Sequence, residues 1–149
     1  MIWLGVDLGD ARVGLALSDP ELSLAHPIGN IQSYGDSFRA LDDVIDVIQR
    51  ERPDAVVVGL PLQLDGTDGK SAKKARRWAV NLEKRLRIMH AGNVGQDSMP
   101  RIILLDERLT TVSAHRQLRE ALISSRQHRP IIDQQSAVLI LQMALDQRR

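Results

Sequence analysis

The sequence contains no cysteine among its 149 residues. This absence excludes a disulfide framework, a zinc site built from thiolates and a cysteine nucleophile. Oxygen and imidazole are the strong metal ligands that remain, and the four histidines do not have metal-ligand spacing. If the protein binds a metal, we therefore expect a hard cation held by oxygen atoms.

Targeting signals and long hydrophobic runs are also lacking. The opening residues, MIWLGVDLGD, have no basic segment and carry a carboxylate at position 7, so they do not match a signal peptide. The apolar run 55–60 is far too short to span a bilayer. We expect a soluble, cytoplasmic protein with no membrane partner. The length and the 43% hydrophobic content predict a single domain over residues 1–149.

Charge is unevenly distributed, although the formal net charge is only +1. Residues 70–87 contain eight basic residues and one acidic residue, so this segment carries +7 and the rest of the chain carries −6. The pattern indicates a locally basic element on a mildly acidic body rather than a uniformly basic nucleic-acid coat. A polyanionic partner remains compatible with this charge distribution.

The hydrophobic pattern predicts an α/β fold with a mixed sheet. Apolar residues alternate over 2–7 and 12–18, which indicates a β-hairpin, and residues 25–32 can add a third antiparallel strand. The short apolar runs 55–58 and 101–105 are typical of strands covered by helices on both faces. Helical periodicity predicts four helices, at residues 36–50, 70–86, 112–123 and 134–145.

Three acidic residues, Asp7, Glu107 and Asp133, lie far apart in sequence, each at the end of an apolar run. In open α/β sheets the reactive residues gather at the carboxyl ends of strands, and Asp7 and Glu107 lie at or near such ends. Burying a carboxylate costs several kcal/mol unless a cation or hydrogen bonds compensate. Convergence of the three would therefore predict a site for Mg²⁺ or Mn²⁺. Asp133 also has a purely structural interpretation, as the N-cap of the helix predicted to begin at residue 134.

The residues next to these carboxylates favour an open site. Asp7 has glycine at both same-face positions, two residues before and two after it, so a nucleic-acid backbone can approach the carboxylate. Asp106 and Glu107 point to opposite faces of their strand, so only one of them can lie with Asp7. We assign Glu107 to that position and expect Arg108 to pair with the other carboxylate.

A glycine-bearing loop, residues 59–69, precedes the basic helix. It can present backbone N–H groups to phosphate at the helix N-terminus, although it lacks the GxxxxGK[ST] spacing of a P-loop. Basic residues of the helix would extend the same anionic track. The predicted nucleic-acid contacts in this helix are Lys70, Lys73, Lys74 and Arg77.

Four segments of the chain resemble the sequence blocks of the bacterial YqgF-type, RuvX-like family. They occur in the family's order, span nearly the whole chain, and read VDLGDARVGLALSD, VVGLPLQLDGTDGKSA, DERLTTVSAHRQL and IIDQQSAVLILQ. The resemblance implies a ribonuclease-H-like fold, a role in maturing the 5′ end of 16S ribosomal RNA, and an older suggestion of Holliday-junction resolution. The family's acidic positions fall on Asp7, Glu107 and Asp133.

The first of these blocks also differs from the family pattern. The family commonly has Thr-Lys or a similar pair before the arginine of this block, whereas this chain has Asp10 and Ala11. A phosphate-facing cation is thereby replaced by a carboxylate and a methyl group. We assign the arginine itself, Arg12, to the nucleic-acid contacts.

The leading hypothesis is a metal-dependent nuclease with two cations, one activating water and the other stabilising the leaving oxygen. Its expected partners are structured RNA or branched DNA, with pre-ribosomal particles as a further candidate, and it would act as a monomer or a homodimer. An actin-like or sugar-kinase-like ATPase is an alternative, because VDLGDARVG also resembles the phosphate-binding hairpin of that superfamily. Those proteins duplicate the domain, and this chain has room for one copy. A non-catalytic nucleic-acid-binding module is the third hypothesis, and it would not need all three carboxylates.

Overall fold

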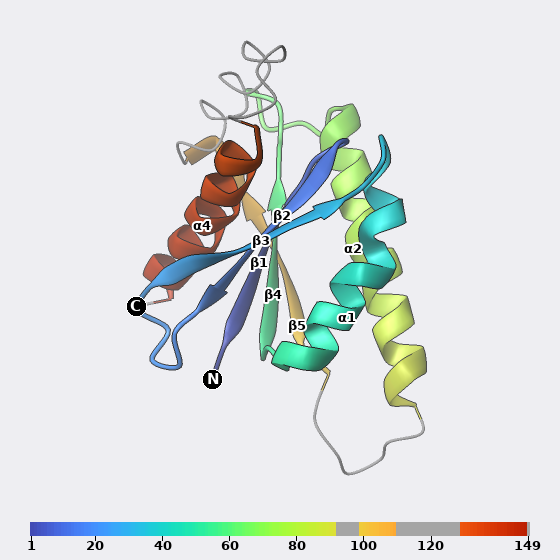
Figure 1. The fold of residues 1–149 in the computed structure, drawn as a ribbon. Coiled ribbons are helices and arrows are strands. Elements are labelled where there is room, and N and C mark those ends of the chain that lie inside the picture. The colour runs from blue at the N-terminus through green and yellow to red at the C-terminus, as the bar shows by residue number, and fades with distance from the viewer. Residues whose placement is uncertain (92–98, 110–128, 149) are drawn as a thin grey trace.

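A five-stranded mixed sheet forms the centre of the computed structural model, which describes residues 1–91, 99–109 and 129–148. The strand order is β3-β2-β1-β4-β5 (Figure 1). The first three strands are an antiparallel meander, and β4 and β5 run parallel to β1. This arrangement confirms the predicted sheet. The strands are β1 (Trp3–Leu8), β2 (Arg12–Ser18), β3 (Ala25–Gln32), β4 (Ala55–Leu60) and β5 (Arg101–Asp106).

Helices cover both faces of the sheet (Figure 1). One face carries α1 (Leu41–Glu51) and α2 (Lys70–His90), and the other carries α4 (Arg129–Gln147). The helix predicted at residues 112–123 lies outside the described residues. None of the helices in the described part of the chain is long and apolar enough to cross a membrane.

Strand alternation divides the core into two clusters. Successive residues of a strand point to opposite faces, so even-numbered positions of β1 and β4 pack under α1 and α2, while odd-numbered positions pack under α4. The α2 side includes the fully buried Trp78, whose Nε1 donates to the Ser37 carbonyl oxygen at 3.0 Å. This division decides which polar side chains can meet at the end of the sheet.

Three helix boundaries differ clearly from the sequence prediction, the first of them the end of α2, which lies at His90, four residues later than predicted. Residues 37–40 form a 3₁₀ turn, η1 (Ser37–Ala40), capped by Asp36, so α1 begins at Leu41. Helix α4 begins at Arg129, five residues earlier than predicted. Pro130 is compatible with this start because the N–H that proline lacks has no intrahelical partner in the first turn. Asp133 is therefore inside α4, and the interpretation of Asp133 as the N-cap is wrong.

Candidate active site

Asp7 lies near the carboxyl end of β1, on the sheet face covered by α4. Its side chain is 1% exposed. Gly5, two residues earlier, shares this face, and a Cβ added there would lie 2.7 Å from the Cβ of Leu141. Helix α4 thus approaches β1 too closely to admit a side chain at position 5, and it covers the strand that carries Asp7.

Glycine occupies the sheet positions around Asp7 on this face. Two glycines are its same-face neighbours along the chain, and a third lies directly opposite it on β2. The fourth glycine lies on β4, the strand on the other side of β1. It follows Val58, which pairs with Val6, so it lies beside Asp7. None of these positions has a side chain of its own next to the carboxylate, and the space over two of them is taken by other groups, Leu141 of α4 over Gly5 and Glu107 over Gly59. We call these four residues the glycine collar: Gly5, Gly9, Gly14 and Gly59.

Glu107 reaches the same region from the other side of β4. It follows Asp106, the last residue of β5, which pairs with Leu60. A Cβ added at Gly59 would overlap Glu107 Oε1 and would lie 2.6 Å from Cδ1 of Ile140, so the Glu107 carboxylate lies over Gly59. The Glu107 side chain is 2% exposed. The strand register and this contact bring Asp7 and Glu107 to one edge and one face of the sheet.

Helix α4 carries position 133 toward this edge. The helix runs antiparallel to β1 (Figure 1), and the Ala137 carbonyl oxygen would lie 3.0 Å from a Cβ at Gly5. Four residues of helix rise about 6 Å along the helix axis. This rise is close to the distance of about 6.6 Å between Gly5 and Asp7, which lie two residues apart on β1. Asp133 lies four residues before Ala137. Its side chain is outside the described residues, so the structure gives its place on the helix only.

The donors at this edge suit a hard divalent cation. Asp7 and Glu107 supply carboxylate oxygens, the ligands that Mg²⁺ and Mn²⁺ prefer, and both groups are buried enough for a cation to be an effective counter-charge. Within residues 1–91, 99–109 and 129–148 no group of three His, Cys, Asp or Glu side chains could hold a metal ion. Because the Asp133 side chain lies outside that description, the three-carboxylate site stays a prediction.

Arg12 lies on the same face as Asp7, on the neighbouring strand. Gly14 is directly opposite Asp7, and Arg12 shares the face of Gly14 because the two are two residues apart on β2. The Nη1 atom of Arg12 is buried and has no hydrogen-bond partner in the described structure. An unsatisfied buried donor of this kind can bind an anion such as a phosphate oxygen.

The predicted basic contacts of α2 lie on the opposite face of the sheet. They nevertheless occupy the same end, because α2 begins at Lys70 after a loop that leaves the carboxyl end of β4. Lys70 and Lys73 are exposed and, among the residues described, have no ion pair. These two lysines are therefore available to an anionic partner.

The other two basic residues have partners within the protein. Lys74 Nζ lies 3.1 Å from Asp10 Oδ1 and 4.0 Å from Asp36 Oδ1. The guanidinium carbon of Arg77 lies 6.0 Å from the centroid of the Phe38 ring. Asp10, one of the two residues at which this chain differs from the family pattern, thus partly neutralises one of the predicted phosphate contacts.

Asp106 is on the face opposite to Glu107 and is paired with Arg108. Arg108 Nη2 lies 2.8 Å from Asp106 Oδ2, and the Arg108 backbone N–H donates to Asp106 Oδ1 at 3.0 Å. The side-chain hydrogen bonds from Arg108 hold the pKa of Asp106 below its ordinary value. Arg108 also lies against Gly66, because a Cβ there would be 3.0 Å from Nη1. The pair fixes the loop between β4 and α2 against the end of β5.

Gly14 and Gly59 were not singled out by the sequence patterns, although they complete the collar. A signal was present, because each glycine interrupts an apolar strand, in RVGLALS and AVVVGL. Glycine inside a strand often marks a close approach of another group. What the sequence could not supply is the register that places these glycines next to Asp7.

The mixed sheet with helices on both faces belongs to the ribonuclease-H-like class of folds, and solved structures share it. Thermus thermophilus RuvC in complex with a Holliday junction substrate aligns with a TM-score of 0.57 at 18% identity, covering 99% of this chain and 95% of RuvC. The fowlpox virus Holliday junction resolvase aligns with a TM-score of 0.51 at 13% identity and covers 99% of both chains. At such low identity these likenesses show the fold alone.

Sequence comparison gives a closer relationship. The model of the RuvX family, described as Holliday junction resolvase, matches residues 1–147, and the chain belongs to this family. A Bifidobacterium adolescentis protein named "Putative pre-16S rRNA nuclease" is 69% identical over 153 aligned positions, which cover 100% of this chain and 99% of that protein. The family expected from the four sequence blocks is confirmed.

Proposed function

We propose that this protein is a metal-dependent nuclease that hydrolyses phosphodiester bonds in RNA and takes part in maturing the 5′ end of pre-16S ribosomal RNA. The observation that carries the proposal is the pair of buried carboxylates, Asp7 and Glu107, at one edge of the sheet inside the glycine collar. Membership of the RuvX family and the names of its relatives support the reaction and the substrate. Residues 1–149 would act as one cytoplasmic domain.

In this proposal Asp7, Glu107 and Asp133 hold Mg²⁺ or Mn²⁺. When bound, these cations supply an activated water and neutralise negative charge on the leaving oxygen. The glycine collar keeps side chains of the sheet itself away from Asp7, and the buried Nη1 of Arg12 would donate to a phosphate oxygen of the substrate. In-line displacement of the 3′ oxygen leaves a 5′-phosphate and a 3′-hydroxyl.

The basic residues of α2 have a separate task. Lys70 and Lys73, exposed and at the same end of the sheet, bind phosphates at a distance from the cleaved bond, and Lys74 and Arg77 extend this track. Such contacts add affinity that depends on salt and not on sequence. Structured RNA, in which several phosphates reach the protein together, benefits most from this track.

Branched DNA is the second candidate substrate. The description of the RuvX family model and the fold shared with Thermus RuvC favour it. Symmetric cleavage of a four-way junction requires a two-fold dimer, whereas trimming of RNA does not. A monomer in solution would therefore argue against junction cleavage before any substrate is added, whereas a dimer is compatible with both candidates.

A cleavage panel tests the proposal directly. Single-stranded RNA, structured precursor RNA and four-way DNA junctions are incubated with Mg²⁺ or Mn²⁺, with Asp7→Asn as the matched inactive control. We expect cleavage of precursor RNA that stops in excess chelator and leaves 5′-phosphate ends. Full activity in chelator, 2′,3′-cyclic ends, or near-native turnover by Asp7→Asn would refute the mechanism. ATP hydrolysis without nucleic-acid cleavage would favour the ATPase alternative.

A further inference from the structure

Tyr34 combines an exposed ring with an uncommon backbone conformation. It is 72% exposed, whereas Trp3 and Trp78 are buried and Phe38 is half-buried, so it is the exposed member of the chain's four aromatic residues. Its φ is 51°, in the left-handed region that bulky residues seldom adopt. Both features work against folding stability, because the ring stays in water and the backbone is strained.

The other residues with positive φ have reasons that lie in the fold. Leu22, with φ 59°, places its side chain in the core, where it is 4% exposed. Arg52, with φ 52°, follows α1 and donates its backbone N–H to the Ile48 carbonyl oxygen at 2.8 Å, as a helix C-cap does. Tyr34 neither enters the core nor ends a helix, so its conformation serves neither purpose.

The turn that carries Tyr34 is a tight β-turn between β3 and η1. Tyr34 and Gly35 both have positive φ, and the Asp36 backbone N–H donates to the Ser33 carbonyl oxygen at 2.9 Å. Positive φ at both central residues is the mark of a type I′ turn, whose preferred central pair is Asn-Gly. The chain thus has a tyrosine where an asparagine would fit the backbone better.

Hydrogen bonds hold this turn against the hairpin that follows Asp7. Ser33 is fully buried, and its Oγ lies 2.9 Å from the Gly9 carbonyl oxygen and 2.8 Å from that of Asp10. The Ser33 backbone N–H also donates to the Ala11 carbonyl oxygen at 3.0 Å. The tyrosine is therefore presented to solvent from a turn that is held against the loop between β1 and β2, at the same end of the sheet as Asp7.

The distance from Tyr34 to the active-site strand suits a neighbouring nucleotide. Tyr34 follows β3, which is two strand spacings, about 10 Å, from β1. A stacked nucleic-acid strand rises about 3.4 Å per nucleotide, so this spacing corresponds to about three base steps. Asp36, at the other end of the turn, lies 4.0 Å from Lys74 of the basic helix, so the turn adjoins the proposed phosphate-binding track.

We propose that Tyr34 is a stacking platform for an unpaired base of the RNA strand near the cleaved bond. The proposal rests on the nuclease function proposed above. Tyr34 would contact a base, whereas the basic helix contacts only phosphates. An aromatic ring stacks on any base, so the platform selects unpaired nucleotides without reading their sequence. RNA with its bases paired in a continuous helix cannot use it.

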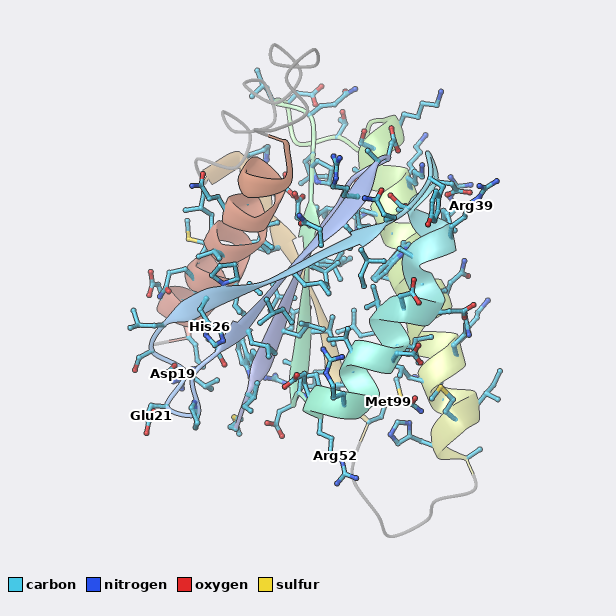
Figure 2. All side chains as sticks on the ribbon, viewed as in Figure 1. Asp19, Glu21, His26, Arg39, Arg52 and Met99 are labelled. Atoms are coloured by element: carbon cyan, nitrogen blue, oxygen red, sulfur yellow. The ribbon has the colours of Figure 1, made fainter. Side chains whose placement is uncertain are left out.

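The test removes the ring while keeping the turn. Tyr34→Asn creates the preferred Asn-Gly pair, so the fold should be retained, and an unfolding midpoint equal to or above that of the parent checks this. Tyr34→Phe keeps a stacking ring. Leu24→Asn is the matched control, because Leu24 is 67% exposed in the loop after β2. Figure 2 labels Asp19 and Glu21 of that loop, far from Arg39 of η1.

Binding is measured in an Asp7→Asn background, so that no cleavage occurs during the titration. The probes are single-stranded RNA oligonucleotides in which one abasic site is moved along the strand, and fluorescence anisotropy gives each Kd. In the parent and in Tyr34→Phe, which both carry a ring, we expect one abasic position to weaken binding by about five- to 150-fold. The same position should have no effect on Tyr34→Asn, and Leu24→Asn should behave like the parent.

Two results would overturn the proposal: an identical abasic profile for Tyr34→Asn and the parent, or no RNA binding at all. Cleavage by the wild-type protein is scored separately in the substrate panel. If the panel shows no cleavage but the abasic profile depends on Tyr34, the nuclease function fails while the stacking contact stands. If the panel shows cleavage but the profile does not depend on Tyr34, only the stacking contact fails.

Discussion

Asp106 and Glu107 are adjacent in sequence, yet the two faces of the sheet give them opposite environments. The Asp106 side chain is 32% exposed and is paired with Arg108, whereas Glu107 is 2% exposed and lies over Gly59. Water and one arginine satisfy an exposed carboxylate at little net gain or cost. Burial of a carboxylate costs several kcal/mol before compensation. The difference is consistent with the proposal that the face toward α4 binds a cation, whereas on the face toward α2 the Asp106–Arg108 pair holds a loop.

The largest effect on cleavage is expected for Asp133→Asn. This variant tests whether α4 supplies the third carboxylate beside Asp7 and Glu107. Asparagine is close to aspartate in shape but cannot supply an anionic ligand, so single-turnover cleavage should fall by about 100-fold or more, beyond what an outer-shell partner contributes. The unfolding midpoint should stay near the wild-type value. Normal cleavage by this variant would remove Asp133 from the site and leave Asp7 and Glu107 in need of another partner.

Gly59→Ala should displace Glu107 on the sheet face toward α4 by overpacking. The new Cβ would overlap the Glu107 carboxylate and press on Ile140, so Glu107 must move. We expect cleavage to fall about 10- to 100-fold, as for a displaced outer-shell group, and stability to fall by about 1–3 kcal/mol, as for an overpacked core. Cleavage is compared with wild type at a temperature at which calorimetry shows both proteins folded. Unchanged cleavage would show that the position of Glu107 does not matter.

The basic helix on the other face is expected to affect binding rather than chemistry. Replacing Lys73, Lys74 and Arg77 together by alanine should weaken RNA binding and reduce its salt dependence by about two to three phosphate contacts. The matched control removes the same charge from the second half of α2 and should leave the slope unchanged, by replacing Lys84, Arg85 and Arg87. Equal slopes for the two triple variants would mean that the first half is only a solvated surface.

The smallest effect is expected for Arg108→Ala. The pKa of Asp106 is lowered in the folded protein from its ordinary value of 3.8, so this pair stabilises the fold above about pH 4. The contribution is lost as the pH falls through the lowered pKa. At pH 7 the variant should melt no more than about 3 °C below wild type. The difference should vanish in strong acid, and a difference that persists there would mean that Arg108 acts through packing.

The strands were predictable because their patterns are local. Ile2, Leu4 and Val6 alternate with the other residues of their strand because successive side chains point to opposite faces of the sheet. This alternation predicts the hairpin, and it places Asp7 on the face opposite to Leu4 and Val6. The prediction places the start of α4 too late because Ile131 and Ile132 are β-branched and read as the end of an extended apolar run before Asp133, although a proline in the first turn favours a helix start. Proline tolerance in the first turn explains how the helix begins there.

The site was predictable only in its residue types. That Asp7 ends a strand can be read from the chain, but the contact of Glu107 with Gly59 depends on the register of β4 against β5, which no local pattern specifies. The pairing of Lys74 with Asp10 joins residues 64 positions apart and was likewise not foreseen. Long-range register and ion pairing arise from tertiary structure.

The central claim is that Glu107, on the face toward α4, binds the cation and that Asp106, on the face toward α2, does not. Its most direct test is a Mn²⁺ titration of Glu107→Gln and Asp106→Asn, with wild type as reference. Each substitution removes one negative charge while nearly preserving shape. The account predicts that Glu107→Gln lowers Mn²⁺ affinity by at least about tenfold, while Asp106→Asn stays within about twofold of wild type because its carboxylate lies on the other face. Wild-type affinity in Glu107→Gln, or an equal loss in both variants, would contradict it.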